Sequence, residues 1–258
     1  MSPNTLVSII TPSYNAEQYI GQMIESIIAQ TYQDWELLIT DDCSMDGSCA
    51  IIEQYAQQDS RVKLFRLERN SGAGVARNES IKHARGRYIA FCDSDDWWLA
   101  DKLQEQIDFM TKRQVQICYS SYYTCDEQSN ITGLVASYKE ISYNHIIRDD
   151  SIGFLTCIYD TAEIGKVYMP STRRRQDWAL KIKLLQKHPM AYGIIKPLAC
   201  YRVRTGSLSS NKFRLVKYNV QVYRDILKYG VVRAWFMFLF VFLPNYVLKK
   251  IRLRIINL

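Results

Sequence analysis

Short apolar runs alternate with segments of helical periodicity through the first half of the chain, and this alternation restricts the possible folds more than any other feature. Each run is four to eight residues long, the length of a buried strand, and the segments between them repeat apolar residues at helical spacing. Strict alternation implies a mostly parallel sheet with helices on both faces. We therefore predict an α/β fold with a Rossmann-like sheet. The predicted strands cover residues 6–11, 35–40, 62–67, 88–91 and 116–123, and the predicted helices cover residues 20–28, 46–57, 72–84 and 102–113.

The second half of the chain has a weaker pattern. Residues 124–170 lack clear periodicity, and we expect loops and short strands that lie over the active edge of the sheet. Residues 176–187 carry an apolar face at helical spacing and predict a further helix. Residues 213–258 read as helical, first amphipathic and then very apolar. We expect one domain over residues 1–212 and a basic, apolar helical segment over residues 213–258.

Charge is distributed unevenly along the chain. From Arg202 onward there are twelve Lys or Arg residues and one acid, whereas the whole chain carries a formal charge of +7. A basic segment of this kind suggests an anionic lipid surface or a nucleic acid as partner. The seven cysteines are scattered without a C-x-x-C pair, which argues against a zinc site or a disulfide framework. We therefore expect reduced thiols in a cytosolic protein without a signal peptide.

Three carboxylates follow the predicted strand 88–91 within four positions, in the sequence Asp93-Ser94-Asp95-Asp96. Like charges at the carboxyl edge of a sheet cost stability unless a cation lies among them. Ligands of open α/β sheets bind at that edge. Asp93 and Asp95 therefore predict a site for a hard cation, Mg²⁺ or Mn²⁺. The alternative is a solvated acidic turn that caps the following helix.

The ends of the first three predicted strands carry motifs as well. Residues 11–15 read TPSYN, residues 40–48 read TDDCSMDGS, and residues 70–78 read NSGAGVARN. Together with D-S-D-D, these four ordered motifs resemble family 2 glycosyltransferases of the GT-A fold, in particular bacterial transferases of O-antigen and surface-polysaccharide assembly. The resemblance is close over residues 5–110 and looser to about residue 206.

The resemblance implies roles for the strand-end residues. Asp42 would contact uracil with support from Asp41, Asp93 would contact ribose and a metal-bound water, and Asp95 would bind the cation directly. For the carboxylates at 41 and 42, capping of the next helix is the alternative. The glycines at 72 and 74 could serve helix packing instead of nucleotide binding. The expected nucleotide-sugar site comprises Pro12, Tyr14, Asp41, Asp42, Arg77, Asp93, Ser94, Asp95, Arg202 and Arg204.

Two further motifs lie downstream. Gln176-Asp177-Trp178 opens a predicted helix where the family usually has Glu-Asp-Trp, which implies that Asp177 is the catalytic base. Simple capping of that helix is the alternative. Residues 201–204 (YRVR) resemble the closing motif of the family, so Arg202 or Arg204 would return to the leaving diphosphate. The arginines at 173–175 could bind a diphosphate or form a solvated loop.

The sequence allows more than one role for the two tryptophans after the acid cluster. Asp96, Trp97 and Trp98 could cover the donor or stack on an acceptor sugar. Trp98 could equally belong to the core.

The resemblance implies an inverting, metal-dependent hexosyltransferase that uses Mn²⁺ or Mg²⁺. It would move one Gal or Glc from a UDP-sugar to a hydroxyl of a polyprenyl-diphosphate-linked sugar, in a β linkage, during O-antigen (lipopolysaccharide) synthesis. The Q-x-x-R-W motif of processive relatives is absent from the chain. The alternatives are a nucleotidyltransferase, or a non-catalytic module that binds membranes or nucleic acid. We expect no nucleic-acid partner, because such a module would not explain Asp93, Asp95 and Asp177.

The most apolar run of the chain lies over residues 231–244, and basic residues flank it on both sides. A crossing of the bilayer needs ~20 apolar residues, so we expect an interfacial helix instead of a span. This predicts a cytoplasmic protein attached peripherally to the inner face of the cell membrane. A core helix is the alternative.

Overall fold

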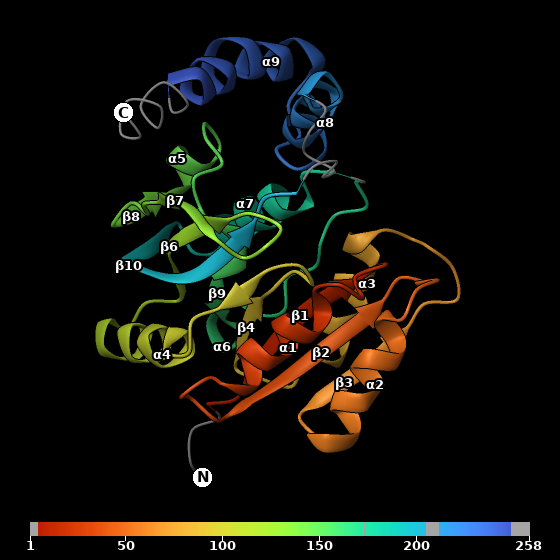
Figure 1. Cartoon of the computed structure of the whole chain (residues 1–258). Coiled ribbons are helices and arrows are strands. Elements are labelled where there is room, and N and C mark those ends of the chain that lie inside the picture. Colours follow the sequence, from red (N-terminus) through yellow and green to blue (C-terminus); the bar gives the residue numbers. More distant parts are fainter. Residues whose placement is uncertain (1–4, 173, 205–211, 249–258) are drawn as a thin grey trace.

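The computed structural model describes residues 5–172, 174–204 and 212–248, which form an α/β fold around one large sheet (Figure 1). The strands of this sheet follow the order β3-β2-β1-β4-β9-β6-β10-β5, with β7 added beside β6 and β8 beside β10. The strands are β1 (Val7–Ser13), β2 (Trp35–Asp41), β3 (Val62–Arg66), β4 (Tyr88–Phe91), β5 (Trp97–Trp98), β6 (Ile117–Cys125), β7 (Ile131–Val135), β8 (Glu140–Ser142), β9 (Ile158–Asp160) and β10 (Met190–Arg202). The helices are α1 (Ile20–Ile28), α2 (Ser48–Gln58), α3 (Ala73–His83), α4 (Lys102–Arg113), α5 (Tyr143–Ile146), η1 (Phe154–Thr156), α6 (Thr161–Ile164), α7 (Gln176–Lys187), α8 (Lys212–Asp225), α9 (Val231–Phe236) and η2 (Met237–Phe242).

The predicted α/β class with a mostly parallel central sheet is confirmed. Strand β1 runs parallel to both β2 and β4, and β2 runs parallel to β3. Because β9 is antiparallel to both of its neighbours, β6 runs in the same direction as β4, and β10 is parallel to β6. The strands and helices predicted before residue 124 are all present, with ends within two residues of the prediction.

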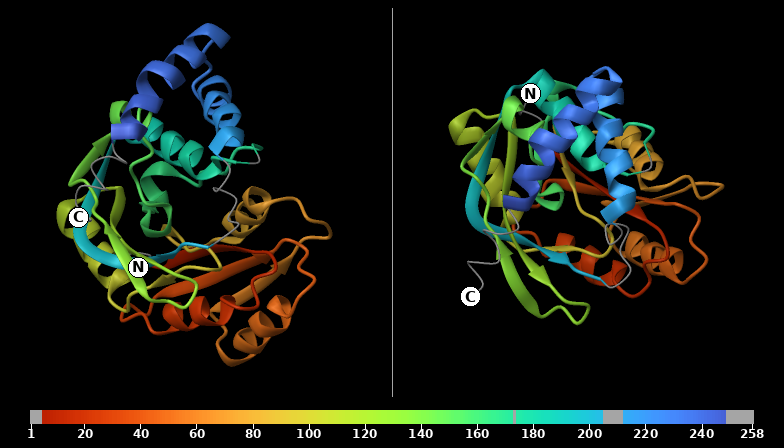
Figure 2. Two further views of the ribbon diagram at one scale, coloured as in Figure 1. Left: turned by 45° about the horizontal axis from the view of Figure 1, so that its top comes forward. Right: turned by 90° about the horizontal axis from the view of Figure 1, so that it is seen from above.

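Helices cover both faces of the sheet, because successive side chains of each strand point to opposite sides. In β1, Ile9 packs into a core formed with α1, α2 and α4. The next residue, Ile10, packs into a second core formed with α3 and α7. Figure 2 shows the two helical layers from further directions.

Two strands differ from the sequence-based expectation. Strand β10, the longest of the described strands, was not predicted. Pro197 lies inside it, at a point where the pairing with β6 shifts register. Strand β9 comes from the region expected to form loops over the active edge, yet it lies inside the sheet between β4 and β6. With three residues, β9 is too short for any periodicity to identify.

The described part of the C-terminal segment is helical, as predicted. Ala234, Phe238 and Phe242 follow one another at four-residue spacing and are buried in the core that also contains Trp178 and Tyr223. This segment therefore completes the core on one face of the sheet, at the end of the molecule away from α2 (Figure 1). The expected boundary at residues 212 and 213 stays a prediction, and it adjoins residues 205–211, which lie outside the described part.

A lysine is buried in the helical layer that contains α1, α2 and α4. Lys102 of α4 is 0% exposed, its Nζ donates a hydrogen bond to Gln106 Oε1 (2.7 Å), and it lies 3.5 Å from the centre of the Trp98 ring. Within the described residues, no carboxylate lies within 4.0 Å of this ammonium group. Burial therefore lowers the pKa of Lys102 from 10.5 to about 7.

Lys102→Met should stabilise the fold near neutral pH. Because the unfolded chain holds the lysine proton up to pH ~10, whereas the folded state loses it near pH 7, the wild type gains stability as pH rises between these values. The buried charge destabilises the wild type by on the order of 4 kcal/mol at pH 7. The variant lacks the donor to Gln106 Oε1, and this unpaired oxygen destabilises it by about 1–3 kcal/mol. We expect urea unfolding to show a net gain at pH 7 that shrinks by pH 9.5.

The exposed Lys112→Met, on the same helix, is the matched control and should change stability little at either pH. A Lys102→Met difference that is the same at both pH values would contradict the buried-charge explanation.

Candidate active site

The sheet brings the first set of predicted site residues to one edge. In the parallel register, Ser13 pairs with Asp41 and Ile10 pairs with Phe91, so β1, β2 and β4 end at the same side. Pro12 is buried inside β1, and the side chain of Tyr14, just beyond the strand, is 50% exposed. An exposed aromatic ring at this edge can stack on a flat ligand such as a nucleobase.

The two acids at the end of β2 organise neighbouring loops. Asp42 is buried and accepts hydrogen bonds from the backbone N–H groups of Ser71 (2.6 Å) and Gly72 (2.7 Å). It thereby holds the loop before α3, where the φ of Gly72 is +91°, a conformation that favours glycine. Asp41 accepts from the backbone N–H of Ser44 (2.8 Å). The next helix is not capped by Asp42, so that alternative does not hold.

Asp93 and Asp95 each pair with an arginine from a different part of the chain. Arg77 of α3 lies 2.5 Å from Asp93 Oδ1, and Arg204 lies 2.7 Å from Asp95 Oδ2. Both carboxylates remain partly exposed, at 34% and 21% of the side chain, and Ser94 lies half-buried between them. Burial and then the charge of Asp93 raise the pKa of Asp95, in spite of Arg204.

The rest of the acid cluster is internal. Asp96 is buried and accepts a hydrogen bond from the backbone N–H of Arg202 (2.9 Å); burial and the charges of Asp95 and Asp93 raise its pKa well above the usual range. Trp98 is also buried, and its Nε1 donates to the carbonyl of Leu155 (3.0 Å). Trp98 therefore belongs to the core, and the prediction that it covers the donor or stacks on an acceptor sugar is wrong for this residue. Trp97 is half-buried.

The two arginines of the closing motif have different surroundings. Pairing of β10 with β5 sets Cys200 opposite Trp97 and so brings Arg202 beside the acid cluster. Arg202 is 3% exposed, and its guanidinium donates to the carbonyls of Asp95 (2.9 Å) and Glu127 (2.9 Å) and to Gln22 Oε1 (2.6 Å). The side chain of Arg204 is 38% exposed. Arg202 is therefore fixed in the protein, whereas Arg204 is accessible to a ligand.

Asp177 lies in the first turn of α7 with 35% of its side chain exposed. The residue before the helix, Arg175, has a φ of +60°, and no side chain caps this end, so capping does not explain the motif. Burial raises the pKa of Asp177, but Lys181 and Arg175 outweigh it, and the pKa lies below its usual value. The carboxylate is thus ionised at neutral pH and open to solvent.

The start of α7 touches the start of α3. Gln176 donates a hydrogen bond to the carbonyl of Thr172, and its amide lies so close to Gly74 that a Cβ there would overlap it. Three residues beyond Gly74, Arg77 pairs with Asp93, and its charge also lowers the pKa of Asp177. The contact between Gln176 and Gly74 therefore joins the helix that carries Asp177 to the helix that carries Arg77.

Two charged residues near Asp177, Lys181 and Asp150, were not predicted from the sequence. Lys181 lies 3.6 Å from Asp177 Oδ2 and 2.6 Å from Asp150 Oδ1. The i, i+4 spacing of Asp177 and Lys181 could have identified the first contact. No pattern in the sequence points to Asp150. Of the arginines at 173–175, Arg175 lies 3.6 Å from Asp150, and position 173 is outside the described residues.

The residues at the sheet edge fit a hard divalent cation. The described residues contain no group of three or more His, Cys, Asp or Glu arranged around a common metal position. Asp93 and Asp95 supply carboxylate oxygens, which Mg²⁺ and Mn²⁺ prefer. Burial and then the charge of Asp93 raise the pKa of Asp95, and a divalent cation beside the two carboxylates would favour their ionised form. Two protein ligands would leave the remaining positions to water or diphosphate oxygens.

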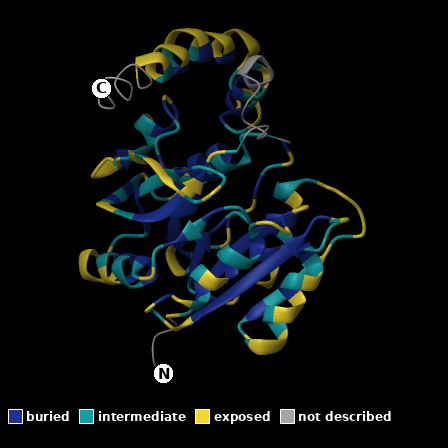
Figure 3. Ribbon diagram, viewed as in Figure 1, coloured by how far each residue is buried: buried dark blue, intermediate teal, exposed yellow. Residues whose placement is uncertain are grey.

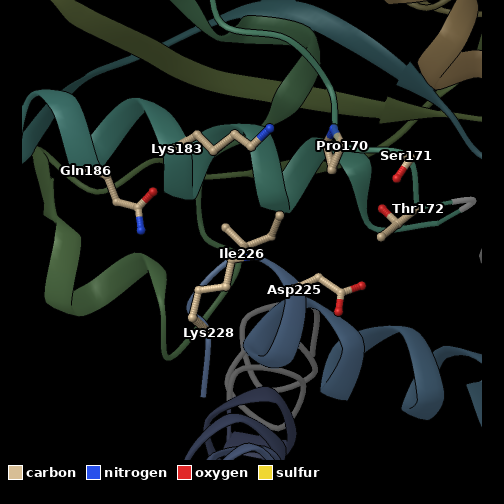
Figure 4. A pocket seen from close by; sticks show the side chains of 8 residues that line it. All are labelled: Pro170, Ser171, Thr172, Lys183, Gln186, Asp225, Ile226 and Lys228. Atoms are coloured by element: carbon tan, nitrogen blue, oxygen red, sulfur yellow. The ribbon is translucent and has the colours of Figure 1, made fainter. Parts of the chain in front are cut away.

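A separate pocket of about 470 Å³ lies between α7, residues 170–172 and the end of α8 (Figure 4). None of the predicted site residues lines it, so it is distinct from the sheet-edge site. Its lining residues are Pro170, Ser171, Thr172, Lys183, Gln186, Asp225, Ile226 and Lys228.

Comparisons with known proteins agree with this geometry. The chain is 40% identical to TuaG of Bacillus subtilis (strain 168), a glycosyltransferase whose name assigns it provisionally to teichuronic acid biosynthesis, over 90% of this chain and 93% of that one. It is 37% identical to the Escherichia coli UDP-Glc:alpha-D-GlcNAc-diphosphoundecaprenol beta-1,3-glucosyltransferase WfgD, over 90% of each chain. The crystal structure of S. aureus TarS 1-349 in complex with UDP superposes with a TM-score of 0.70 at 22% identity, covering 90% of this chain and 69% of that chain.

These findings remove the alternatives of a nucleotidyltransferase and a non-catalytic module. Residues 8–165, more than half of the chain, match the family described as glycosyl transferase family 2. The likeness to TarS shows the GT-A fold. The chain therefore belongs to glycosyl transferase family 2 and is a glycosyltransferase enzyme, similar to transferases of bacterial surface-polysaccharide synthesis.

Proposed function

We propose that this chain transfers one hexose from a UDP-sugar to a hydroxyl of a polyprenyl-diphosphate-linked sugar, with inversion to a β linkage. Of the two hexoses expected from the sequence, Gal and Glc, we favour Glc, because the relative WfgD is named as a UDP-Glc-dependent β-1,3-glucosyltransferase. The observation that carries the proposal is the contact between the starts of α3 and α7: Gln176, next to Asp177, lies against Gly74, and Arg77 of the same helix α3 pairs with Asp93. This contact supports a single site for donor and acceptor groups.

The proposed donor site uses the ends of β1, β2 and β4. Tyr14 and the acids Asp41 and Asp42 would receive the nucleoside, with Asp42 also holding the loop before α3. Arg77 and Arg204, paired with Asp93 and Asp95 in this structure, lie where a diphosphate would need cationic partners. Arg202 is assigned a positioning role because its guanidinium is committed to protein groups.

In the proposed reaction, Asp177 takes the proton of the acceptor hydroxyl while that oxygen forms a bond to the anomeric carbon. The bond from this carbon to the diphosphate oxygen breaks on the opposite side, and its electron pair leaves with UDP. One base is enough, because a single displacement forms no covalent glycosyl-enzyme. Asp93 and Asp95 would hold the divalent cation, which when bound neutralises charge on the diphosphate. Arg204 would stabilise the same charge from the other side.

Turnover with a panel of nucleotide sugars tests this proposal. The acceptor is a synthetic α-GlcNAc-diphosphate-lipid, and the linkage of the product is determined by NMR. We expect transfer from UDP-Glc or UDP-Gal and a β-linked disaccharide. Transfer only from sugars on another nucleotide, or an α-linked product, would contradict the proposed donor or the proposed inversion.

We further propose that the C-terminal helices attach the enzyme to the inner face of the cell membrane. Residues Val231–Leu248 have a mean hydropathy of 1.7, so by length and composition alone this helix could also cross a bilayer. Its buried side, with Phe238 and Phe242, belongs to the core, and a crossing would remove these residues from it. The opposite side is exposed, including Val232, Phe236 and Phe240 at 85%, 55% and 67% (Figure 3). An interfacial position therefore fits better.

Basic residues support attachment to an anionic surface. Arg224, Lys228 and Arg233 lie before or within this helix. A basic residue near an anionic membrane contributes ~1 kcal/mol. The predicted basic cluster at positions 249, 250, 252 and 254 lies outside the described residues.

Replacing Val232, Phe236 and Phe240 together with Ser should weaken binding to vesicles of anionic phospholipid by about 10²-fold or more, because each apolar side chain contributes about 1.5–3 kcal/mol when buried. Co-sedimentation at low and physiological salt measures the effect. The matched control replaces Met45, Ile131 and Leu134, which are equally exposed on other elements, and should bind vesicles like the wild type. Equal loss in both variants, or a wild type that ignores vesicles at low salt, would contradict this surface.

A further inference from the structure

A lysine is buried beside the proposed base, one turn further along α7. The side chain of Lys181 is 2% exposed, and its Nζ lies 2.6 Å from Asp150 Oδ1 and 3.6 Å from Asp177 Oδ2. The same ammonium donates a hydrogen bond to the carbonyl of Ile152 (2.8 Å). Lysine is almost never buried to this extent unless it is paired. The fold therefore provides specific polar partners for this buried charge.

The two carboxylates share the ammonium unequally. At 2.6 Å, Asp150 is within hydrogen-bond distance of Lys181, whereas the 3.6 Å to Asp177 exceeds it. Coulomb attraction still acts over that longer distance, because the ammonium itself is buried. Lys181 can thus favour the ionised form of Asp177 without using the lone pairs of its carboxylate. A general base needs both conditions, because it must be charged and must accept the proton of the acceptor.

The other charges around Asp177 have different partners. Arg77 of α3 is paired with Asp93 at 2.5 Å, on the donor side of the site. Arg175, before α7, lies 3.6 Å from Asp150 Oδ2. Burial raises the pKa of Asp177. Among the groups that lower it, Lys181 has the largest effect, followed by Arg175, the backbone N–H of Trp178 and then Arg77. Lys181 is also the one of the three cations that lies on the helix of the base.

We propose that Asp150 and Lys181 are a positioning pair for Asp177: Asp150 holds the ammonium at a distance that keeps the base ionised with its lone pairs free for the acceptor hydroxyl. This inference rests on the proposed role of Asp177 as the base. It assigns a function to Asp150, from the loop before η1, and to Lys181, neither of which belongs to the motifs that resemble the family.

The pH dependence of kcat/KM for sugar transfer tests the pair. In the double variant Asp150→Asn/Lys181→Met, both charges are removed together, so no unpaired charge is left buried. We expect its acid limb to move to higher pH by about one unit or more, because an opposite charge at this distance lowers a carboxylate pKa by about 1–3 units. At pH values on the acid limb, activity should fall about 10-fold relative to the wild type at the same pH, and it should recover toward the wild type at neutral pH.

The single variant Asp150→Asn should move the acid limb the other way. With Asp150 neutral, the ammonium of Lys181 is drawn to the remaining carboxylate, Asp177. The base then becomes a weaker proton acceptor, so kcat should fall at every pH while the acid limb shifts to lower pH. Opposite shifts in the two variants distinguish tuning of the base from simple loss of structure.

Lys183→Met is the matched control, because Lys183 lies on the same helix and donates to the carbonyl of Tyr168 (3.0 Å) instead of contacting Asp177. Its pH profile should match the wild type, and UDP affinity should be unchanged in all three variants. A double variant with the wild-type acid limb, or one that loses UDP binding, would overturn the positioning role. Full activity of Asp177→Asn would instead contradict the assignment of Asp177 as the base. The two results therefore distinguish a failure of the positioning pair from a failure of the proposed base.

Discussion

Replacing Asp177 with Asn should slow sugar transfer by about 10²–10⁴-fold, the usual contribution of a general base. The amide keeps the size of the side chain but cannot take the proton of the acceptor hydroxyl. The pair Lys181 and Asp150 keeps its 2.6 Å contact in this variant, so the start of α7 should hold its position. UDP affinity should stay within about twofold of the wild type, because the proposed nucleoside site is at the ends of β1 and β2.

Single-turnover transfer and calorimetric UDP titration measure the two effects separately. Asp108→Asn, an exposed acid on α4, is the control and should retain full activity. If Asp177→Asn transfers sugar at the normal rate, another group takes the proton. If it loses UDP binding, the carboxylate belongs to the donor site instead.

Much of the fold could be predicted because its first half follows local rules. In β1, β2 and β4 every residue is buried, and strands buried on both faces have nearly continuous apolar sequences. Helices α4 and α7 were predicted to the residue, because their apolar positions repeat at helical spacing. Strand β10 could not be predicted, since exposed positions such as Ile195 and the interior Pro197 break any alternation, and pairing with β5, β6 and β8 makes it a strand.

The candidate site could likewise be predicted only in part. Residues at strand ends could be predicted to meet because parallel strands share a carboxyl edge, and Asp41, Asp42 and Asp93 do lie there. Contacts between segments that lie far apart in the sequence could not be predicted. The roles of Arg202 and Arg204 differ only because β10 pairs with β5 and buries the first guanidinium. Asp150 was missed because its contacts are with Arg175 and Lys181, 25 and 31 positions further along the chain.

Asp95→Asn should reduce transfer on the order of 10³-fold, because it removes a carboxylate ligand of the proposed cation from a transition state that gathers charge on the diphosphate. Chelation with EDTA should abolish wild-type turnover, and Mn²⁺ or Mg²⁺ should restore it. Asp101→Asn, whose carboxylate pairs with Lys196 away from the site, is the control and should keep full activity. Full wild-type activity in excess chelator would contradict a metal-dependent reaction.

Stability should change in the opposite direction from activity in Asp95→Asn. Burial and then Asp93 raise the pKa of Asp95 above its unfolded value, so the folded state holds the proton more tightly than the unfolded chain. Wild-type stability therefore falls as pH rises from below the unfolded pKa through the folded one, and the ionised carboxylate destabilises the metal-free fold at neutral pH. The neutral amide lacks this cost, so thermal unfolding at pH 7.5 without divalent cation should show a variant at least as stable as the wild type. Added Mn²⁺ should then stabilise the wild type and leave the variant nearly unchanged. A variant that is inactive and also clearly destabilised would mean that Asp95 serves the fold, through its 2.7 Å contact with Arg204, instead of the cation.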